Sequence, residues 1–359
     1  MKRKILFVVP FYLGRSPSQR YRIEWYIKYF EENGYQCDFS YLLTPSLDKI
    51  FYDKRYVFLK FLLVFRFLFI RIRDVFRAKN YNLIFVQREA CFLGFSFFEK
   101  KLAKRSKMIF DFDDAIWLPN VSEANKKWEW LKNYKKTEKI ISYAHHVIAG
   151  NQYLADYAKK FNTKISIIPT TIDLNFYQIK EKKKSEKITI GWSGSPTTIQ
   201  HFRYGEAFLK AIQKKYPNKI QFKLIGDPSY YNEELKIQGI AWEKESEVSE
   251  LSDLDIGIMP LPDNKWTAGK CGLKGLQYMA LGIATIMSPV GVNTEIIKDG
   301  ENGFLAAEEK EWIEKLSILI EDAELRKKIG TAGRLTVEQK YSSQSQQDKY
   351  IEIFEQVCS

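Results

Sequence analysis

Short apolar runs alternate with longer amphipathic stretches along the whole chain. The apolar runs predict buried strands, which read KILFVVPF, CDFSYLL, NLIFVQ, KMIFDF, HHVIAG and KISIIP in the first half, and KITIGWSG, FKLIG, DIGIMPLP, ATIMSPV and NGFLA in the second. Between the first two runs, Ile23, Ile27 and Phe30 have helical spacing and predict one helix from about residue 18 to residue 33, closed by Gly34. This alternation is typical of α/β proteins with doubly wound parallel sheets.

A strongly charged segment separates the two series of strands. It reads IKEKKKSEK, residues 179–187, and is expected to be a linker. A length of 359 residues suits two domains of ordinary size. We therefore expect two Rossmann-like domains, one over residues 1–178 and one over residues 188–340, with a C-terminal helix, residues 341–359, that completes the first domain.

One segment departs from the alternating pattern. Residues 56–77, YVFLKFLLVFRFLFIRIRDVFR, are nearly all large and apolar, but they include basic residues at positions 60, 66, 71, 73 and 77. These charges interrupt the segment too often for a membrane span. Two interpretations remain: a buried helix between the second and third strands, or a basic aromatic helix that lies in the interface of an anionic membrane.

The charge is distributed unevenly between the halves. Of the net charge of +12, residues 1–180 contribute +15 and residues 181–359 contribute −3. An anionic partner is therefore expected at the first half, and nucleic acid, an anionic membrane and a phosphorylated substrate are candidates. The cysteines, at positions 37, 91, 271 and 358, are far apart, which favours a reducing compartment and argues against structural zinc. The apolar N-terminus lacks a cleavage site and is interpreted as a strand rather than a signal peptide.

Two predicted strand ends in the second half carry groups suited to a diphosphate. After KITIGW come Ser193, Gly194, Ser195 and Thr197, where a glycine permits close backbone approach and hydroxyls can donate hydrogen bonds. This segment either caps the following helix, with Pro196 in its first turn, or cradles a diphosphate.

The second strand end leads into GKCGLKGLQYMALG, which places Lys270 and Lys274 four residues apart before an apolar helical run. A helix N-terminus disfavours cations, so these lysines either belong to a solvated face or neutralise an anion that the helix also attracts. If both strand ends face one diphosphate, the second interpretation explains the pair.

The second half resembles a known family. GLKGLQYMALGIATIMSPVGVNTEIIKDGENGFLA is similar to the C-terminal donor-binding signature of GT-B fold glycosyltransferases, especially glycosyltransferase family 4, and HHVIAGNQYLADYAKKFNTKISIIPTTID resembles the segment that ends their N-terminal domain. The resemblance implies a retaining, metal-independent transferase that uses a nucleotide sugar, with the donor in the C-terminal domain and the acceptor mainly in the N-terminal one.

This sequence departs from the family pattern at three places. Aligned on LQYMA, the second of two family glutamates is replaced by Gln277 and the first by Gly269. Gln277 can still hydrogen-bond a ribose, whereas Gly269 offers no side chain. The arginine that often follows the first strand of the second domain is absent, which leaves Lys270 and Lys274 to carry the leaving-group charge.

Charged side chains also gather at predicted strand ends of the first half. FDFDDAIW supplies Asp113 and Asp114, which cap the next turn, bind a metal as an Asp-x-Asp motif, or orient the acceptor hydroxyl and take its proton. We favour the last role and expect no metal. The candidate acceptor-binding residues are Arg15, Gln19, Arg20 and Arg88, with Arg22 nearby. Several arginines in one crevice would suit a phosphate-bearing acceptor.

The leading hypothesis is a glycosyltransferase that moves a sugar from a nucleotide sugar to a lipid-linked or polysaccharide acceptor. It would be cytoplasmic and peripheral on the inner face of the membrane, bound through residues 56–77. An epimerase, a phosphorylase and a non-catalytic nucleotide-sugar-binding module are alternatives. Nucleic acid is not expected as a partner, because no nucleic-acid-binding module is recognisable. His145 and His146, at the start of a strand, are expected to be structural.

Overall fold

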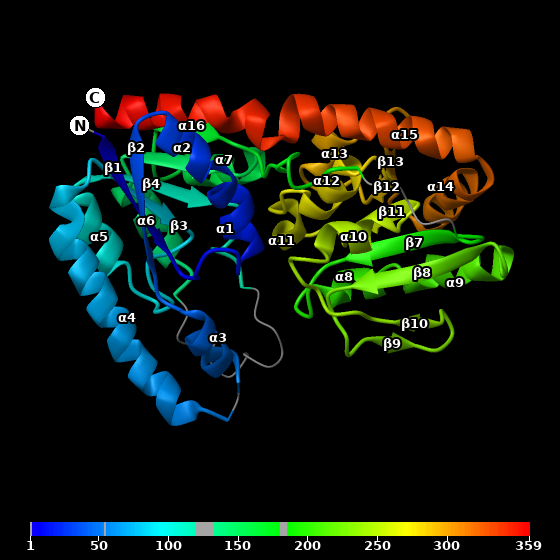
Figure 1. Cartoon of the computed structure of the whole chain (residues 1–359), viewed down its shortest axis with the longest axis horizontal. Coiled ribbons are helices and arrows are strands. Elements are labelled where there is room, and N and C mark those ends of the chain that lie inside the picture. Colours follow the sequence, from blue (N-terminus) through cyan, green and yellow to red (C-terminus); the bar gives the residue numbers. More distant parts are fainter. Residues whose placement is uncertain (1, 54, 120–132, 180–184) are drawn as a thin grey trace. The chain divides into compact units, whose positions relative to one another are not determined.

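The computed structural model describes residues 2–53, 55–119, 133–179 and 185–359. The chain divides into two compact units, unit 1 (Met1–Thr170 and Gln346–Ser359) and unit 2 (Thr171–Ser345) (Figure 1). The first boundary thus falls before the expected one at residue 178. The expected linker, 179–187, lies largely outside the described residues.

Unit 1 is built on a parallel sheet of six described strands in the order β2-β1-β3-β4-β5-β6. The strands are β1 Arg3–Val9, β2 Tyr35–Tyr41, β3 Leu83–Gln87, β4 Lys107–Phe112, β5 His146–Ala149 and β6 Ile165–Ile167. All of them match predicted apolar runs. The strand order reverses between β1 and β3, and ligands of such sheets bind beyond the carboxyl ends of the strands at this switch point.

The helices of unit 1 cover this sheet. They are α1 Pro17–Arg22, α2 Ile27–Glu32, α3 Pro45–Tyr52, α4 Val57–Arg77, α5 Phe97–Ala103, α6 Lys136–Tyr143, α7 Gln152–Ala158 and most of α16 Ser343–Cys358. The core is aromatic, and Phe7, Phe30 and Phe85 pack with Tyr350 and Phe354 of α16. The C-terminal helix thus completes the core of the N-terminal unit.

The single helix expected over residues 18–33 is wrong. The structure breaks it into α1, a 3-10 turn at Glu24–Tyr26, and α2. Tyr21, Arg22 and Ile23 are all at most 1% exposed. On a straight helix, successive side chains point in directions about 100° apart, so one buried face cannot hold three in a row. The break at Ile23 changes the direction of the chain, which allows all three side chains to be buried.

Unit 2 contains a second parallel sheet, of five described strands in the order β13-β12-β11-β7-β8. Its strands are β7 Ile188–Ser193, β8 Ile220–Ile225, β11 Ile256–Met259, β12 Ala284–Met287 and β13 Phe304–Leu305, again as predicted. A small hairpin of β9 Tyr231–Asn232 and β10 Ile237–Gln238 was not predicted. The sheet reverses between β7 and β11, the two strands whose ends carry the diphosphate candidates.

The helices of unit 2 lie on both sides of its sheet. They are α8 Ile199–Arg203, α9 Glu206–Lys215, α10 Glu247–Ser252, α11 Lys265–Ala268, α12 Leu273–Ala280, α13 Asn293–Ile296, α14 Glu309–Glu321 and α15 Ala323–Thr336. Trp192, Phe208 and Trp312 are central to the core. The two sheets, each with its own hydrophobic core, confirm the predicted pair of Rossmann-like domains.

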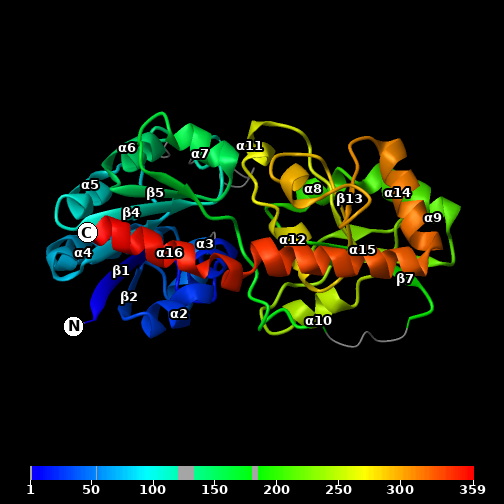
Figure 2. The same ribbon diagram turned by 90° about the horizontal axis from the view of Figure 1, so that it is seen from above.

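Of the segment 56–77, Val57–Arg77 form one long helix, α4, beside α5 (Figure 1 and Figure 2). One face is buried in unit 1 through Leu63, Phe67 and Ile70, whereas Phe58 and Phe69 are more than two-thirds exposed. The buried side agrees with the interpretation of a core helix, whereas the exposed apolar side leaves the interpretation of an interfacial helix open. In the described part of the chain, no helix has both the length and the apolarity that crossing a bilayer requires.

Candidate functional site

The carboxyl end of β7 joins α12 through a buried hydrogen bond. The backbone N–H of Ser193 donates to the hydroxyl of Tyr278 on α12, with an N···O distance of 2.8 Å. Burial raises the pKa of Tyr278, which keeps this hydroxyl protonated. The Nζ of Lys274, also on α12, lies 5.2 Å from the centre of the Trp192 ring. The structure therefore brings Ser193 and Lys274 to one end of the sheet, at its switch point.

Gly194 is needed here for packing as well as for ligand approach. A Cβ at this position would lie 2.0 Å from a carbon of the Trp192 ring. The ring is fully buried, so it cannot move aside cheaply. Gly194 thus allows the chain to turn over the indole that supports Lys274.

The hydroxyls after Gly194 form a local network. The Oγ of Ser195 lies 2.9 Å from the Oγ1 of Thr197, and the Ser195 N–H donates to the Oγ1 of Thr198. Helix α8 begins at Ile199, so the expectation that Pro196 lies in the first helical turn is wrong. Pro196 instead sits in a turn that holds Ser195 and Thr197 next to the strand end.

The two lysines do not share a helix face, contrary to expectation. Helix α12 begins at Leu273, after Gly272 in the left-handed conformation with φ of 68°, so Lys270 lies in the connection that precedes it. The left-handed Gly272 changes the direction of the chain before α12, so Lys270 and Lys274 do not lie on one continuous helix. The Nζ of Lys270 lies 5.0 Å from the centre of the Trp266 ring. Both lysines are half-buried cations placed over indoles, and each indole stabilises its cation.

Gln277 is held by a buried carboxylate that the sequence did not indicate. Its Nε2 donates to Glu247 Oε1 at 2.9 Å and lies 2.6 Å from the hydroxyl of Tyr177. Trp242 Nε1 donates to the same Glu247 oxygen at 3.0 Å. Gln277 and Glu247 are both at most 4% exposed. A carboxylate thus lies beside the residue that replaces a family glutamate, and no spacing along the chain links the two positions.

In unit 1, Arg88 connects the ends of β3 and β4. Its Nε donates to Asp113 Oδ1 at 3.0 Å, and its Nη2 forms an ion pair with Asp114. Desolvation opposes the charge of Arg88, but the two carboxylates outweigh it and raise the pKa of the guanidinium. Arg88 also has a left-handed backbone, with φ of 61°. Such a conformation is uncommon for a residue with a side chain and concentrates at functional sites.

Asp111 has a different partner from Asp113 and Asp114. It forms a fully buried ion pair with Arg22, whose Nε lies 3.2 Å from both carboxylate oxygens. Burial disfavours the charge on Arg22, but Asp111 reverses this and raises the pKa of Arg22 well above its usual value. This pair, which also contacts the backbone oxygen of Ile168, joins α1 to β4 and the end of β6. It is a structural pair beneath the candidate site.

The remaining acceptor candidates belong to the loop after β1 and to α1, which a hydrogen bond from Gln87 to Ser18 joins to the end of β3. Arg15 donates to Asp48 of α3 at 2.7 Å and is 39% exposed. Gln19 is fully buried and donates to Glu24, which also accepts from the backbone N–H of Gly14. Arg20 is buried against Tyr21 and Trp25. These residues shape the loop after β1, and among them only Arg15 is substantially exposed.

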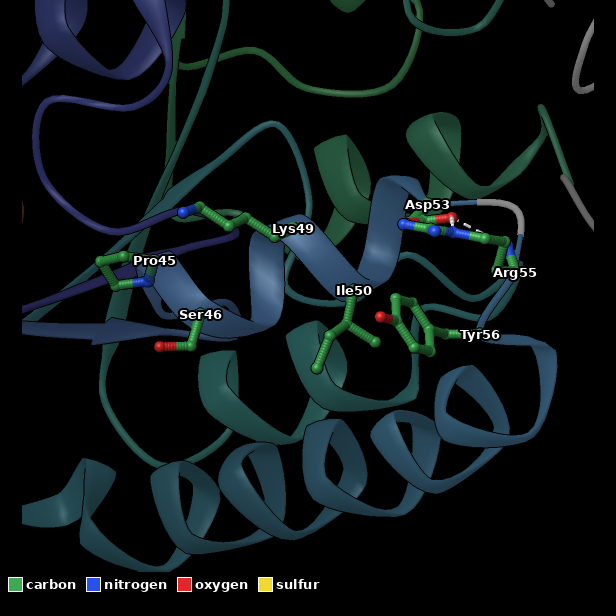
Figure 3. Close-up of a pocket in the computed structure, with 7 residues that line it drawn as sticks. All are labelled: Pro45, Ser46, Lys49, Ile50, Asp53, Arg55 and Tyr56. Atoms are coloured by element: carbon green, nitrogen blue, oxygen red, sulfur yellow. Dashed lines mark hydrogen bonds and ion pairs between the residues drawn. The ribbon is translucent and has the colours of Figure 1, made fainter.

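A surface hollow of about 540 Å³ lies between α3 and the start of α4 (Figure 3). It is lined by Pro45, Ser46, Lys49, Ile50, Asp53, Arg55 and Tyr56. Arg55 pairs with Asp53 at 2.6 Å, which lowers the pKa of that carboxyl to about 2. None of the predicted site residues lines this hollow.

Metal binding has no evident site in the ranges described. Those residues contain no group of three His, Cys, Asp or Glu side chains placed to hold a metal ion. At Asp113 and Asp114, the guanidinium of Arg88 already occupies the position of a cation.

Comparisons with known proteins agree with this geometry. Residues 189–322 match the model of glycosyl transferases group 1. A search of curated proteins finds no match. Among solved structures, a glycosyltransferase from Rickettsia africae superposes with a TM-score of 0.71 at 15% identity, covering 99% of this chain and 98% of that chain.

Two further solved structures are similar over the whole chain. Sucrose-phosphate synthase from Thermosynechococcus elongatus gives a TM-score of 0.71 at 13% identity, covering 99% of both chains. Anabaena HepE, in complex with UDP and glucose, gives a TM-score of 0.67 at 14% identity, covering 99% of this chain and 100% of that chain. The fold is therefore GT-B.

Proposed function

We propose that this chain, a glycosyltransferase of the GT-B type with a group 1 domain over residues 189–322, moves a sugar from a nucleotide sugar to a lipid-linked or polysaccharide acceptor. We further propose that it acts at the cytoplasmic face of the membrane, with retention of anomeric configuration and without a metal. The observation that carries the proposal is the cluster at the switch point of unit 2. There, a strand end, a hydroxyl network and two lysines over indoles occupy the place where such sheets bind ligands.

Donor binding is assigned to unit 2. As the bond between the anomeric carbon and the diphosphate oxygen breaks, negative charge grows on the leaving nucleoside diphosphate. Lys270 and Lys274 would neutralise this charge, assisted by the hydroxyls of Ser195 and Thr197. Gln277 would hydrogen-bond the ribose, oriented by Glu247. Solved HepE structures contain UDP or UDP-glucose, so a UDP sugar is the first donor to test.

Acceptor activation is assigned to Asp113 and Asp114 of unit 1. Both carboxylates pair with the guanidinium of Arg88 at the ends of β3 and β4, and their oxygens are suited to accept a hydrogen bond from the acceptor hydroxyl and orient its oxygen. The new bond would form between that oxygen and the anomeric carbon as the bond from this carbon to the diphosphate oxygen breaks, and the hydroxyl proton would pass to the carboxylate of Asp113 or Asp114. Arg15 would contact a phosphate of the acceptor.

The test is a transfer assay with radiolabelled nucleotide sugars, with membrane lipids or polysaccharide as acceptor. We expect label in the lipid or glycan fraction, undiminished by EDTA. Loss of activity in EDTA that Mn²⁺ restores would overturn the metal-independent part. Nucleotide-sugar binding without transfer to any acceptor would favour a non-catalytic binding module, to which the replacement of both family glutamates also points.

A further inference from the structure

Helix α4 presents a row of large apolar side chains to solvent. The row consists of Phe58, Phe61, Leu62, Phe65, Phe69, Ile72 and Phe76, each between 47% and 74% exposed. The spacing of three and four residues places them on one face along most of the helix. An apolar patch of this extent is uncommon on a protein surface that meets only water, and it marks an interaction site.

The opposite face of α4 is fixed by a buried arginine. Arg71 is fully buried and donates to Val9 O at 2.9 Å, to Asp74 at 2.7 Å and to the oxygens of Ser40. These bonds join the helix to the ends of β1 and β2. The helix therefore cannot rotate to bury its aromatic row, and the charge of Arg71 serves the fold rather than a partner.

The charges on the outer side are all positive. Arg66 and Arg73 are exposed and flank the aromatic row, and the guanidinium of Arg105, just after α5, lies 5.3 Å from the centre of the Phe76 ring. The only acid in α4 is Asp74 and the only acid in α5 is Glu99, and both are fully buried. Arg73 Nη2 lies 3.7 Å from the buried Asp74, and the outer faces of both helices otherwise carry cations and aromatic rings without an exposed carboxylate.

We propose that this surface, the aromatic row of α4 with Arg66, Arg73 and Arg105, binds an anionic membrane leaflet. The phenyl rings would enter the boundary between headgroups and acyl chains, and the three guanidinium groups would contact lipid phosphates. A second copy of the chain fits less well. In a two-fold pairing of this surface, arginines would meet arginines with no carboxylate to neutralise them. The inference rests on the proposed function only in that it names the surface that brings the transferase to a lipid-linked acceptor.

The experiment is co-sedimentation of the full chain with vesicles of phosphatidylcholine alone, or mixed with equal parts of phosphatidylglycerol. We expect binding to the mixed vesicles. Arg66→Gln with Arg73→Gln should lower the partition coefficient roughly 30-fold, as two cations near such a surface contribute. Phe61→Gln, Phe65→Gln and Phe69→Gln together should lower it on the order of 100-fold, including in high salt, where the contribution of the arginines is screened.

A matched control is Lys310→Gln with Lys328→Gln, which removes two exposed cations from unit 2. This variant should bind like wild type, and all three variants should keep the wild-type melting temperature because every altered side chain is exposed. The inference is overturned if wild type stays in the supernatant, if the control loses as much binding as the arginine pair, or if the chain is a dimer that the phenylalanine variant dissociates.

Vesicle binding needs no turnover, so it separates this inference from the proposed function. Transfer to a soluble acceptor without vesicle binding would overturn the membrane surface and keep the transferase. Vesicle binding without transfer to any acceptor would overturn the transferase and keep the membrane surface.

Discussion

The two units place different groups beside the cations of their candidate sites. In unit 1, Arg22 and Arg88 at the carboxyl edge of the sheet are neutralised by aspartates. In unit 2, Lys270 and Lys274 lie over tryptophan rings. A carboxylate neutralises a positive charge, whereas an indole stabilises a cation through its ring electrons and carries no negative charge of its own.

The comparison shows what net charge can and cannot locate. The first half of the chain carries the excess of +15, and the sequence therefore placed the anionic partner there. Part of that excess lies on α4, where Arg66 and Arg73 are exposed. The half with the negative balance contains residues 189–322, which match the model of glycosyl transferases group 1, so net charge does not locate that domain.

The largest effect is expected at the neutralised carboxylates of unit 1. Asp113→Asn and Asp114→Asn keep the size of the side chains but remove the anion that orients the acceptor. Transfer should fall by about 10²- to 10⁴-fold, with nucleotide affinity unchanged. Steady-state kinetics and calorimetry measure the two quantities. Asp156→Asn, at an exposed aspartate of α7, is the control and should retain full activity. Full activity in both site variants would remove them from the mechanism.

A loss of stability is expected at the buried pair beneath them. Arg22→Leu leaves Asp111 buried without its cation, and such changes cost about 3–5 kcal/mol of the free energy of unfolding. Urea denaturation followed by circular dichroism measures the loss. The double variant with Asp111→Leu should recover part of it, since no uncompensated charge remains. Wild-type stability of Arg22→Leu would show that the pair is not structural.

Smaller effects on binding are expected at the lysines of unit 2. Lys270→Ala and Lys274→Ala should each weaken nucleotide-diphosphate binding by roughly 1.5–3 kcal/mol, the range for hydrogen bonds to charged groups, without lowering the melting temperature. Isothermal calorimetry with UDP measures the affinity. Lys265→Ala, at an exposed lysine of α11, provides the control. Unchanged affinity in both variants would show that the lysines belong to a solvated surface and do not bind the diphosphate.

The smallest expected effect is a loss of stability of unit 1 as the pH falls. Desolvation lowers the pKa of His145 and of His146 below the usual 6.5. The Nδ1 of His145 accepts a hydrogen bond from the Met108 N–H, which requires a neutral ring. The unfolded chain then binds protons more readily, so stability is complete above pH 6.5 and falls as the pH drops below it. Melting curves between pH 8 and pH 5 should show this decline, and His145→Gln should reduce it. A melting temperature that rises on acidification would contradict the assignment.

The sequence predicted the strands of both sheets, because short apolar runs bounded by turns have few other structures available. It did not predict the break at Ile23, since burial of three successive side chains depends on partners far along the chain, such as Asp111. It placed Lys274 and Ser193 at one site through strand order alone.

Other parts of the site had no local signal. Glu247 precedes β11 and Gln277 follows it, so only the folded sheet brings them into contact. The pairing of Arg88 with Asp113 and Asp114 likewise depends on adjacent strands β3 and β4. Which partner a charge at a strand end meets is therefore a property of the folded sheet.

The central claim is that unit 2 binds the diphosphate of a nucleotide sugar through Lys270 and Lys274. The most direct test is a thermal-shift titration of wild type and of the Lys270→Ala, Lys274→Ala double variant with UDP, GDP, CDP and dTDP sugars. A ligand that binds only the folded state at about 100 times its dissociation constant adds about 2.7 kcal/mol of stability. We predict that at least one of these donors raises the wild-type melting temperature and leaves the double variant nearly unchanged. Equal shifts in both proteins, or no shift with any donor, would contradict the account.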